Sequence, residues 1–481
     1  MTTRVLRAAR RSPAVSAALS FILPGLGQGV SGAVARGLLL ALPVVALLVL
    51  AFAVLSQGTA RAFSLLLQPS FLIGLIVLDA VLLMYRGAAI VDAYLLTKRL
   101  HGAGATPSQR NISVGVLAAL LAATLSMHAV LGIIGVKTYV AVSSIFDPSG
   151  PIGGLGELPP ASLDPNATQG APTPTPAPTP VPPPPWSQDG RLNILLVGGD
   201  AGPGRFSLRT DTMILASVDI ATGRAAFFGI PRNLINVPLP PESAKAFRCG
   251  CFPDLLNGLY VYAGQHPESF PGGSARGYLA LQGAVSALAG VQVDGMLVVD
   301  LNGFVRLVNA LGGININVPY AIYDSSYPLE DGSRDVRLYI RAGQQHMNGH
   351  LALAYARSRH QDDDYHRMAR QQLVLLALRR AVNPCSLIPR LPELIDIAGQ
   401  SLWSNFSIKD LPDLLALAQR VDTRRIGQFA FSPPAIPEYL NARGVAAAHA
   451  MVANAFSSSA ASPAPSAATP MPGSSGSSSG C

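Results

Sequence analysis

The first third of the chain alternates long apolar stretches with short basic segments. Three stretches of about 20 residues, the length that crosses a bilayer as a helix, carry almost no charge. They run from Gly37 to Ser56, from Phe63 to Tyr85 and from Ile112 to Val136. The pattern predicts a helical membrane anchor over residues 1–146 with three spans, at about 37–56, 63–85 and 112–136.

Two features near these spans need separate interpretation. The stretch from Ala14 to Val30 is apolar, but Pro24-Gly-Leu-Gly27 interrupts it. We expect an interfacial or re-entrant segment there, with a fourth span as the alternative. Asp79 is the only acid within the three spans. We interpret it as reaching toward the membrane interface, and a functional carboxylate inside the membrane is the alternative.

Basic residues decide the predicted orientation. The segment before the first span and the loop between the second and third spans are rich in arginine and lysine: Arg4, Arg7, Arg10, Arg11 and Arg36, then Arg86, Lys98, Arg99 and Arg110. The loop after the first span offers only Arg61. The positive-inside rule then places the N-terminus in the cytoplasm and everything after Val136 outside. We predict a multi-pass cell-membrane protein with an extracytoplasmic C-terminal domain and no cleavable signal peptide.

Composition divides the rest of the chain. Residues 147–189 are rich in proline and predict an extended, semi-rigid linker. Residues 457–481 are Ser/Ala/Pro/Gly-rich and predict a disordered tail. Residues 190–456 remain as one large domain. The 481-residue chain is 49% hydrophobic with a net charge of +8. This charge owes much to the basic residues that flank the membrane, which suit anionic lipid headgroups and require no nucleic-acid partner.

The domain at 190–456 alternates strand and helix patterns. The expected strands are Leu192 to Val197, the hairpin of Met213 to Val218 with Ala225 to Ile230, Met296 to Leu301, and Ile314 to Val318. The expected helices are Gly303 to Leu311 and, at least in part, Leu351 to Ala356 and Arg367 to Val382. This alternation predicts an α/β or α+β sheet with helices on its faces.

Four cysteines occur in the chain: Cys249, Cys251, Cys385 and Cys481. In an extracytoplasmic domain they predict one disulfide, and the pairing that we consider is Cys385 with Cys249 or Cys251. A zinc site is disfavoured, because Cys-Gly-Cys lacks the usual ligand spacing.

An arginine-rich segment carries the most informative chemistry. If the chain is extended at Arg357-Ser-Arg359, both guanidinium groups project to one side. Asp364, Arg367 and Gln371 lie at i, i+3 and i+7, on one face of a helix. This chemistry suits a phosphate or pyrophosphate. The alternative is a solvated surface of Arg–Asp pairs that includes the acids at 362–364.

Three further motifs at strand ends offer matching chemistry. A glycine-rich loop with Asp200 follows the first strand, Arg209-Thr-Asp211-Thr212 opens the next, and Ile230-Pro-Arg232 ends the third. Carboxylates at strand ends are oxygen ligands of the kind that Mg²⁺ takes beside substrate phosphates. Each aspartate alone is more often a turn or capping residue. The glycine-rich loop lacks the Gly-Lys-Ser/Thr of a Walker A motif.

Together these motifs resemble the LytR-CpsA-Psr family. The resemblance rests on five boxes in order, over about Leu192 to Val382: Asn193-Ile-Leu-Leu-Val-Gly-Gly-Asp200, Arg209-Thr-Asp211-Thr-Met, Ile230-Pro-Arg232, Val308-Asn-Ala-Leu-Gly-Gly313, and Ala354-Tyr-Ala-Arg-Ser-Arg-His360 with Asp364-x-x-Arg367-x-x-Arg370-Gln371. Each box alone is unspecific, and the specificity lies in their order.

The resemblance implies a fold, an activity and a site. The family has a mixed sheet between helices, an α-β-α architecture, with a long apolar pocket for a polyprenyl chain. Its members transfer a phospho-glycan from an undecaprenyl-pyrophosphate carrier onto peptidoglycan. By matching motif, Asp200 and Asp211 hold Mg²⁺, and the pyrophosphate is gripped by Arg209, Arg232, Arg357, Arg359 and Gln371. Asp364 and Arg367 belong to the acceptor side, where a carboxylate acts as base. The catalytic set is then Asp200, Asp211, Arg232, Asp364 and Arg367.

This chain also departs from the family pattern. Asn233 stands where the family usually has aspartate, and Leu255-Leu-Asn257-Gly replaces a Lys-x-Asn box. The three-span anchor is larger than the usual single span. Two alternatives to the magnesium-dependent phosphotransferase therefore stay open. One is a pyrophosphatase that uses water as acceptor, and the other is a non-enzymatic lipid- or glycan-binding sensor of the envelope.

Overall fold

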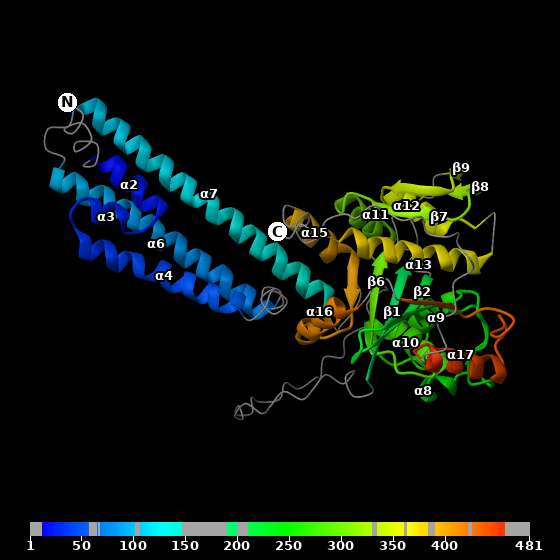
Figure 1. The fold of residues 1–481 in the computed structure, drawn as a ribbon. Coiled ribbons are helices and arrows are strands. Elements are labelled where there is room, and N and C mark those ends of the chain that lie inside the picture. The colour runs from blue at the N-terminus through cyan, green and yellow to red at the C-terminus, as the bar shows by residue number, and fades with distance from the viewer. Residues whose placement is uncertain are drawn as a thin grey trace, which may run out of the picture. The chain divides into compact units, whose positions relative to one another are not determined.

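A computed structural model describes residues 12–56, 65, 68–101, 106–146, 190–199, 210–329, 334–359, 363–382, 390–421 and 426–456 (Figure 1). The chain forms two compact units, residues 1–142 and 143–481. The predicted linker at 147–189 and tail at 457–481 lie outside the described residues.

Three long helices dominate the first unit. They are α4 (Val34–Ser56), α6 (Pro69–His101) and α7 (Pro107–Ile145), and all three are long and apolar enough to cross a membrane. Their number matches the sequence prediction. Their bounds differ, since α6 begins at Pro69 and both α6 and α7 extend well beyond the predicted apolar stretches. On α6 the added turns carry Arg86 and Asp92, whose charged groups find partners on neighbouring helices: Arg86 donates to the carbonyl of Phe21, and Asp92 pairs with Arg36 at 2.5 Å.

Two short helices precede these spans. They are α2 (Pro13–Ile22) and α3 (Leu26–Val30). The helical conformation is interrupted between them at Gly25, whose φ is +101°. A Cβ on Gly27 would lie 2.0 Å from the carbonyl oxygen of Ser16, so only glycine fits there. The interruption predicted from Pro24-Gly-Leu-Gly27 is therefore confirmed. Neither helix is long enough to span a bilayer.

Asp79, the single acid within the three predicted stretches, is paired inside the first unit. Oδ1 of Asp79 on α6 lies 2.7 Å from Nδ1 of His128 on α7, and the His128 side chain is buried. Asp79 therefore has a partner within the helices, which the sequence did not indicate, and its place relative to the membrane interface stays a prediction. The sequence shows no period that links the two residues, because their partnership depends on how α6 and α7 pack.

A six-stranded mixed sheet forms the centre of the second unit. Its order is β11-β6-β1-β2-β3-β12. The strands are β1 (Arg191–Gly199), β2 (Thr210–Asp219), β3 (Ala225–Gly229), β6 (Gly295–Asp300), β11 (Leu402–Ser404) and β12 (Gly427–Ala430). β1 runs antiparallel to β2 and parallel to β6, and β3 runs antiparallel to β2 and parallel to β12. The predicted hairpin of β2 and β3 is confirmed.

Helices cover both faces of this sheet, as the α/β prediction requires (Figure 1). One face packs on the main hydrophobic core with α8 (Pro241–Ala244), α9 (Leu259–Gln265), α10 (Arg276–Ala289) and α17 (Ala442–Asn454). The other face lies toward α11 (Leu301–Ala310), α12 (Gly349–Arg357) and α13 (Asp364–Ala381). Two further helices, α15 (Leu391–Ser401) and α16 (Leu411–Arg420), follow α13 in the chain. Alternation along the strands explains this sandwich, since Leu195 and Val197 of β1 enter the main core while Leu196 faces α11–α13.

Smaller elements complete the second unit. Three two-stranded sheets pair β4 (Val237–Pro238) with β5 (Cys251–Phe252), β7 (Ile314–Val318) with β10 (Gly343–Met347), and β8 (Ile322–Pro328) with β9 (Asp335–Ile340). Short 3₁₀ turns occur at Leu256–Gly258, Gly273–Ala275 and Ile408–Asp410. A second core joins β7–β10 to α11, α12 and α13.

The disulfide differs from the expected pairing. Cys249 is bonded to Cys251, with a Cα–Cα distance of 5.1 Å. The pairing of Cys385 with either residue is therefore wrong, and Cys385 itself lies outside the described residues. Gly250 has φ +66°, a left-handed conformation that turns the chain back and brings the two neighbours within bonding reach.

Candidate active site

An apolar cavity of about 240 Å³ lies between the sheet and the α11–α13 layer. Its floor is a row of cross-strand neighbours, Leu297 on β6, Leu196 on β1 and Ile214 on β2. Its other walls include Phe304 on α11 and Val374 on α13. These side chains share the cavity because residues of one parity on paired strands face the same side of a sheet.

The same cavity has a charged and polar part. It is lined by Asp211, Thr212, Asp300, Asp324, Arg357, Arg359, Arg367 and Gln371. Gly198 lies in the row beside the leucine floor, between Thr212 on β2 and Val299 on β6. Without a side chain on Gly198, the apolar floor continues openly into the polar part. The cavity can therefore accept a ligand with one hydrocarbon end and one anionic end.

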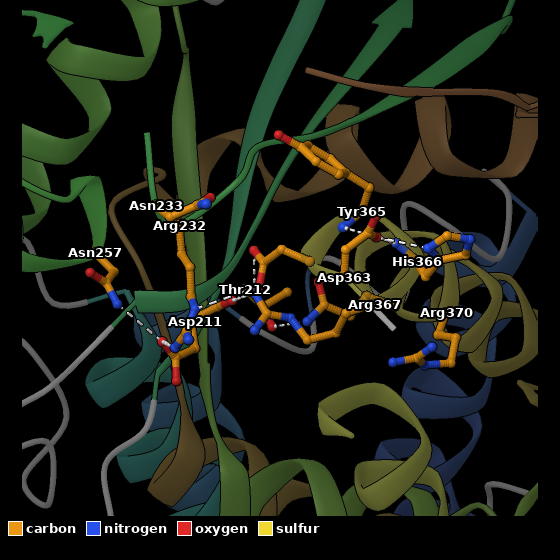
Figure 2. Close-up of polar contacts among 12 residues, drawn as sticks. Asp211, Thr212, Arg232, Asn233, Asn257, Asp363, Tyr365, His366, Arg367 and Arg370 are labelled. Carbon is orange, nitrogen blue, oxygen red and sulfur yellow. Dashed lines mark hydrogen bonds and ion pairs between the residues drawn. The ribbon is translucent and has the colours of Figure 1, made fainter. Parts of the chain in front are cut away.

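Asp211 at the start of β2 is a meeting point of three segments (Figure 2). Nη1 of Arg232 donates a hydrogen bond to Oδ1 of Asp211 at 2.7 Å. Nδ2 of Asn257 donates to the same oxygen at 3.3 Å. The Asp211 side chain remains 30% exposed, so its carboxylate is accessible from the cavity.

Asp364 and Arg367 form a second ion pair on the first turn of α13. Nη2 of Arg367 donates to Oδ2 of Asp364 at 2.9 Å, and Nε of Arg232 lies 3.7 Å from Oδ1 of Asp364. Asp363 caps the helix by accepting from the backbone N–H groups of Tyr365 and His366, which fixes where the first turn begins. Arg232 thus bridges Asp211 and Asp364.

Burial perturbs both members of this pair. Loss of solvent raises the pKa of the Asp364 carboxyl above its ordinary value, although the Arg367 and Arg232 guanidinium groups act in the opposite direction. Loss of solvent likewise lowers the pKa of Arg367, whose side chain is almost fully buried. A carboxylate with a raised pKa, held by arginines beside a cavity, is suited to general-base chemistry.

The two arginines at 357 and 359 reach the cavity by a geometry other than the predicted one. Arg357 is the last residue of α12, so the chain is not extended there, and it turns at Ser358. Both arginines nevertheless line the cavity. The conclusion from shared parity holds for the side chains, but the extended backbone assumed for it is wrong.

A buried polar frame holds this turn. Asp324 on β8, only 1% exposed, accepts from the Ser358 hydroxyl at 2.9 Å and from the Arg359 N–H at 3.3 Å. Arg370 donates from Nε to the Tyr355 carbonyl at 2.9 Å, and also donates to the Ser358 carbonyl. These contacts position Arg357 and Arg359 on rigid elements. Sequence reasoning missed Asp324, because no local pattern connects β8 with the end of α12.

Gln371 ties α13 to the sheet. Its Nε2 donates to the Thr212 hydroxyl at 2.8 Å. The predicted helical face of Asp364, Arg367 and Gln371 is thus present. Arg367 and Gln371 line the cavity and contact β2, and Asp364 is paired with Arg367.

Asn233, where the family pattern has aspartate, faces away from Asp211. Its Nδ2 donates to Oε1 of Glu438 at 2.7 Å, and Figure 2 shows Asn233 beyond Arg232 on the same segment. An aspartate at 233 would place a carboxylate against the Glu438 carboxylate. Burial raises the pKa of the nearby Tyr365 hydroxyl to about 12, and Glu438 adds to this effect. The negative charge missing at 233 is thus supplied on this side by Glu438.

The structure brings together most of the predicted site. Five of the predicted residues line one cavity: Asp211, Arg357, Arg359, Arg367 and Gln371. Arg232 and Asp364 are ion-paired with lining residues, Arg232 with Asp211 and Asp364 with Arg367. Asp200 and Arg209 lie outside the described residues. Asn257, which the sequence offered only as a remnant of a box, proves to be a partner of Asp211.

Comparison with known proteins is consistent with this geometry. The profile of the LytR_cpsA_psr family matches residues 166–434, more than half of the chain. An uncharacterized protein of Staphylococcus aureus is 29% identical over 230 residues, covering 46% of this chain and 50% of the relative. A Bacillus subtilis protein named polyisoprenyl-teichoic acid–peptidoglycan teichoic acid transferase TagV is 33% identical over 122 residues, covering 25% of this chain and 30% of the relative. The chain therefore spans half or less of the length of these two relatives.

A solved structure is also similar. The crystal structure of Bacillus subtilis TagV aligns with 55% of this chain and 96% of its own, at 22% identity and a TM-score of 0.40.

Proposed function

Because the chain belongs to the LytR-CpsA-Psr family, we propose that it transfers a glycan phosphate from a polyprenyl-pyrophosphate carrier to a cell-wall acceptor such as peptidoglycan. The observation that carries this proposal is one cavity with an apolar floor and an arginine-lined end. A polyprenyl chain matches the row of Leu297, Leu196 and Ile214, and a pyrophosphate matches the arginines beyond it. The name of the TagV relative, a polyisoprenyl-teichoic acid–peptidoglycan transferase, supports this assignment.

Each charged residue then has a chemical role. Arg357 and Arg359 bind the pyrophosphate oxygens, with Gln371 beside them. Arg232 orients Asp211 and Asp364 relative to one another. Asp364 accepts the proton of the attacking sugar hydroxyl, and Arg367 holds that carboxylate in place.

The reaction follows from these roles. The acceptor oxygen attacks the glycan-side phosphorus, and the bond from that phosphorus to the bridging oxygen breaks. Polyprenyl phosphate leaves, and the acceptor keeps the glycan phosphate through a new phosphodiester. The hydroxyl proton passes to Asp364. Arginines that already surround the pyrophosphate stabilise the charge that develops on its oxygens.

Magnesium fits this donor set. Among the described residues, no three His, Cys, Asp or Glu side chains converge into a complete cage. The accessible Asp211 carboxylate, together with Asp200, which the family motif assigns to the same ion, suits an ion held by one or two carboxylates and by substrate phosphate oxygens. When bound, Mg²⁺ neutralises pyrophosphate charge and polarises the phosphoryl group.

The proposed placement follows the sequence. Residues 1–146 anchor the chain with the N-terminus in the cytoplasm, residues 147–189 act as a spacer, and residues 190–456 carry the activity outside, ahead of the tail at 457–481. The three apolar helices support an anchor. Protease added to intact spheroplasts should remove the 190–456 domain, and a domain that resists until the membrane is opened would contradict this orientation.

The direct test uses the full chain in detergent with a short-chain polyprenyl-pyrophosphate glycan, with and without Mg²⁺ and peptidoglycan. We expect Mg²⁺-dependent release of polyprenyl phosphate together with labelling of the peptidoglycan. Release without labelling would indicate a pyrophosphatase. Tight binding with no release in any condition would instead indicate a lipid-binding sensor.

A further inference from the structure

The Cys249–Cys251 disulfide lies at one end of a backbone ladder whose other end holds the active site. We propose that this disulfide is a thiol–disulfide exchange site. Its redox state would control the stability of the hydrogen bonds that Arg232 and Asn257 donate to Asp211. The reductant would be an extracytoplasmic protein dithiol. The last step of this inference rests on the proposed function, but its chemistry does not.

The ladder pairs residues 232–239 with residues 250–257. At the site end, Asn257 N–H donates to the Arg232 carbonyl at 3.0 Å, and Leu256 N–H donates to the Leu234 carbonyl at 2.9 Å. At the disulfide end, Pro238 pairs with Cys251, and the carbonyl of Gly250 accepts from Leu239 N–H at 3.2 Å. The two segments are therefore paired at both ends, near Cys251 and at the Arg232–Asn257 pair, with only a few residues of each segment between the paired ends.

Both residues at the site end bind one carboxylate oxygen. Arg232 and Asn257 donate to Oδ1 of Asp211 at 2.7 and 3.3 Å. Their convergence requires the two strands of the ladder to keep their register. A change at the disulfide end that disturbs this register would therefore weaken the two hydrogen bonds to Asp211.

The disulfide does little as a structural staple. It closes a loop of only three residues, and the stabilisation that a disulfide gives through the unfolded chain falls with loop length. The hairpin around it already has buried anchors in Val237 and Phe252, both in the main core. A role besides stability is the simpler account of this cysteine pair.

The environment of the pair favours exchange at one sulfur. Cys249 is exposed, whereas Cys251 is buried, so an external thiolate reaches Cys249. Arg248, its neighbour in the chain, and Lys245, four residues earlier, are both exposed. Positive neighbours favour a thiolate at Cys249 once the bond is open, which is the setting of a reactive cysteine.

The exchange is a balanced two-electron step. A thiolate of the external dithiol attacks Sγ of Cys249, the Cys249–Cys251 bond breaks, and its electron pair and one proton go to Sγ of Cys251. The second thiol of the same dithiol then attacks the external sulfur of this mixed disulfide and releases Cys249. The protein gains two thiols, and the external dithiol becomes a disulfide.

The test uses the full chain in detergent, with Cys385→Ser and Cys481→Ser so that only this pair reports. The protein is equilibrated in buffers of reduced and oxidised dithiothreitol, and alkylated thiols are then counted by mass spectrometry. We expect reversible reduction of the folded protein. In single variants, Cys249 (in Cys251→Ser) should be alkylated at least tenfold faster than Cys251 (in Cys249→Ser). A pair that is reduced only after unfolding overturns the proposal.

Coupling between the disulfide and the active site can be measured without any substrate, by hydrogen exchange. Hydrogen exchange of the Leu256 and Asn257 amides should be at least fivefold faster after reduction. The Cys249→Ser/Cys251→Ser variant should show the fast rate in both buffers. Equal protection in the oxidised and reduced protein would overturn the coupling.

Donor turnover in both states then separates this inference from the proposed function. Absence of turnover in both states would remove the proposed function while the thiol and amide results stand. Turnover of the protein with the cysteine pair should be present and should fall on reduction. Turnover of the Cys249→Ser/Cys251→Ser variant should not change on reduction. These two results together support both the proposed function and the redox inference.

Discussion

Nη1 of Arg232 donates to Oδ1 of Asp211 at 2.7 Å, and this contact joins the ends of two neighbouring strands at one edge of the cavity. Through its Nε, the same guanidinium lies 3.7 Å from Asp364. One arginine therefore sets the distance between the carboxylate that we assign to Mg²⁺ and the carboxylate that we assign to proton transfer. The candidate chemistry depends on this arrangement more than on any single motif.

Asp211→Asn should reduce release of polyprenyl phosphate by about 100-fold or more, because it removes the charge that faces Mg²⁺ and Arg232. Its effect on stability should stay within about 1 kcal/mol, since the residue is partly exposed. Initial rates and thermal unfolding followed by fluorescence of the buried Trp403 would measure both quantities. Asp413→Asn, an exposed acid on α16, is the matched control. A variant that keeps the native rate would remove Asp211 from the site.

Asp364 should determine the acidic limb of the pH–rate profile, the range where turnover falls as the pH is lowered. Its pKa is raised in the folded protein, mainly by burial, so turnover should fall as pH drops through that raised value and the base becomes protonated. Arg367→Met removes a charge that favours the carboxylate, so the limb should move to higher pH. Arg380→Met, on the exposed last turn of α13, should leave the limb in place. A limb that does not move in Arg367→Met would exclude Asp364 as its source.

The same raised pKa has the opposite pH dependence for stability: turnover falls as the pH is lowered, whereas the stabilising contribution falls as the pH is raised. The folded protein binds the Asp364 proton more tightly than the unfolded chain, whose pKa is near the ordinary 3.8. The stabilising contribution is therefore complete below that value and is lost as pH rises through the folded pKa. Comparing the acid unfolding of the native chain and of Asp364→Asn by Trp403 fluorescence checks this, and a contribution that grows with pH would contradict it.

The cavity floor should decide the affinity for the lipid. Leu297 is 37% exposed, so Leu297→Glu places a charge in the cavity at little cost to folding. We expect at least tenfold weaker binding of a polyprenyl pyrophosphate, because the hydrocarbon chain would have to desolvate a carboxylate. Leu279→Glu, at 40% exposure on α10, is the control. Equal affinity in the two variants would place the lipid elsewhere.

Asn233 and Glu438 should behave as a coupled pair. Asn233→Asp places two carboxylates where a 2.7 Å hydrogen bond now lies, and we expect a loss of about 0.5–1 kcal/mol in stability. Glu438→Gln in the same chain should restore most of it by allowing the opposite hydrogen bond. Thermal unfolding of the native chain, Asn233→Asp, Glu438→Gln and the double variant would measure this coupling. If the two single effects on stability simply add in the double variant, the contact contributes nothing.

Asp79 and His128 should be coupled across α6 and α7. Each single alanine variant leaves an ionisable partner without its hydrogen bond in an apolar setting, so the double variant should be less destabilised than the sum of the two singles. A coupling of about 1 kcal/mol is expected for a hydrogen bond between membrane helices. Heat denaturation of the full chain in detergent, across the four-member cycle, provides the value. A coupling of zero would show that the two helices are held together by packing alone.

Local patterns in the sequence determined much of this protein. Three apolar stretches gave the number of long anchor helices, because the length of a span is a local property. Short apolar runs bounded by turn residues gave β1, β2, β3, β6 and β7, and the spacing of Asp364, Arg367 and Gln371 gave one face of α13. The order of the five motif boxes gave the family. Each of these depends on residues that are close in the chain, where the periods of helix and strand act directly.

Only the tertiary structure decided the contacts between distant segments. Asp211 meets Asn257 and Arg232 because separate elements end at the same edge of the sheet, and Asp324 holds Arg359 because β8 lies against the end of α12. The partnership of Asp79 with His128 depends in the same way on how two helices pack. The physical reason is common to these contacts: periodicity states which way a side chain faces, and the packed chain decides what it meets. The bond between Cys249 and Cys251 is a local exception, because it depends on the left-handed backbone of the residue between them, Gly250.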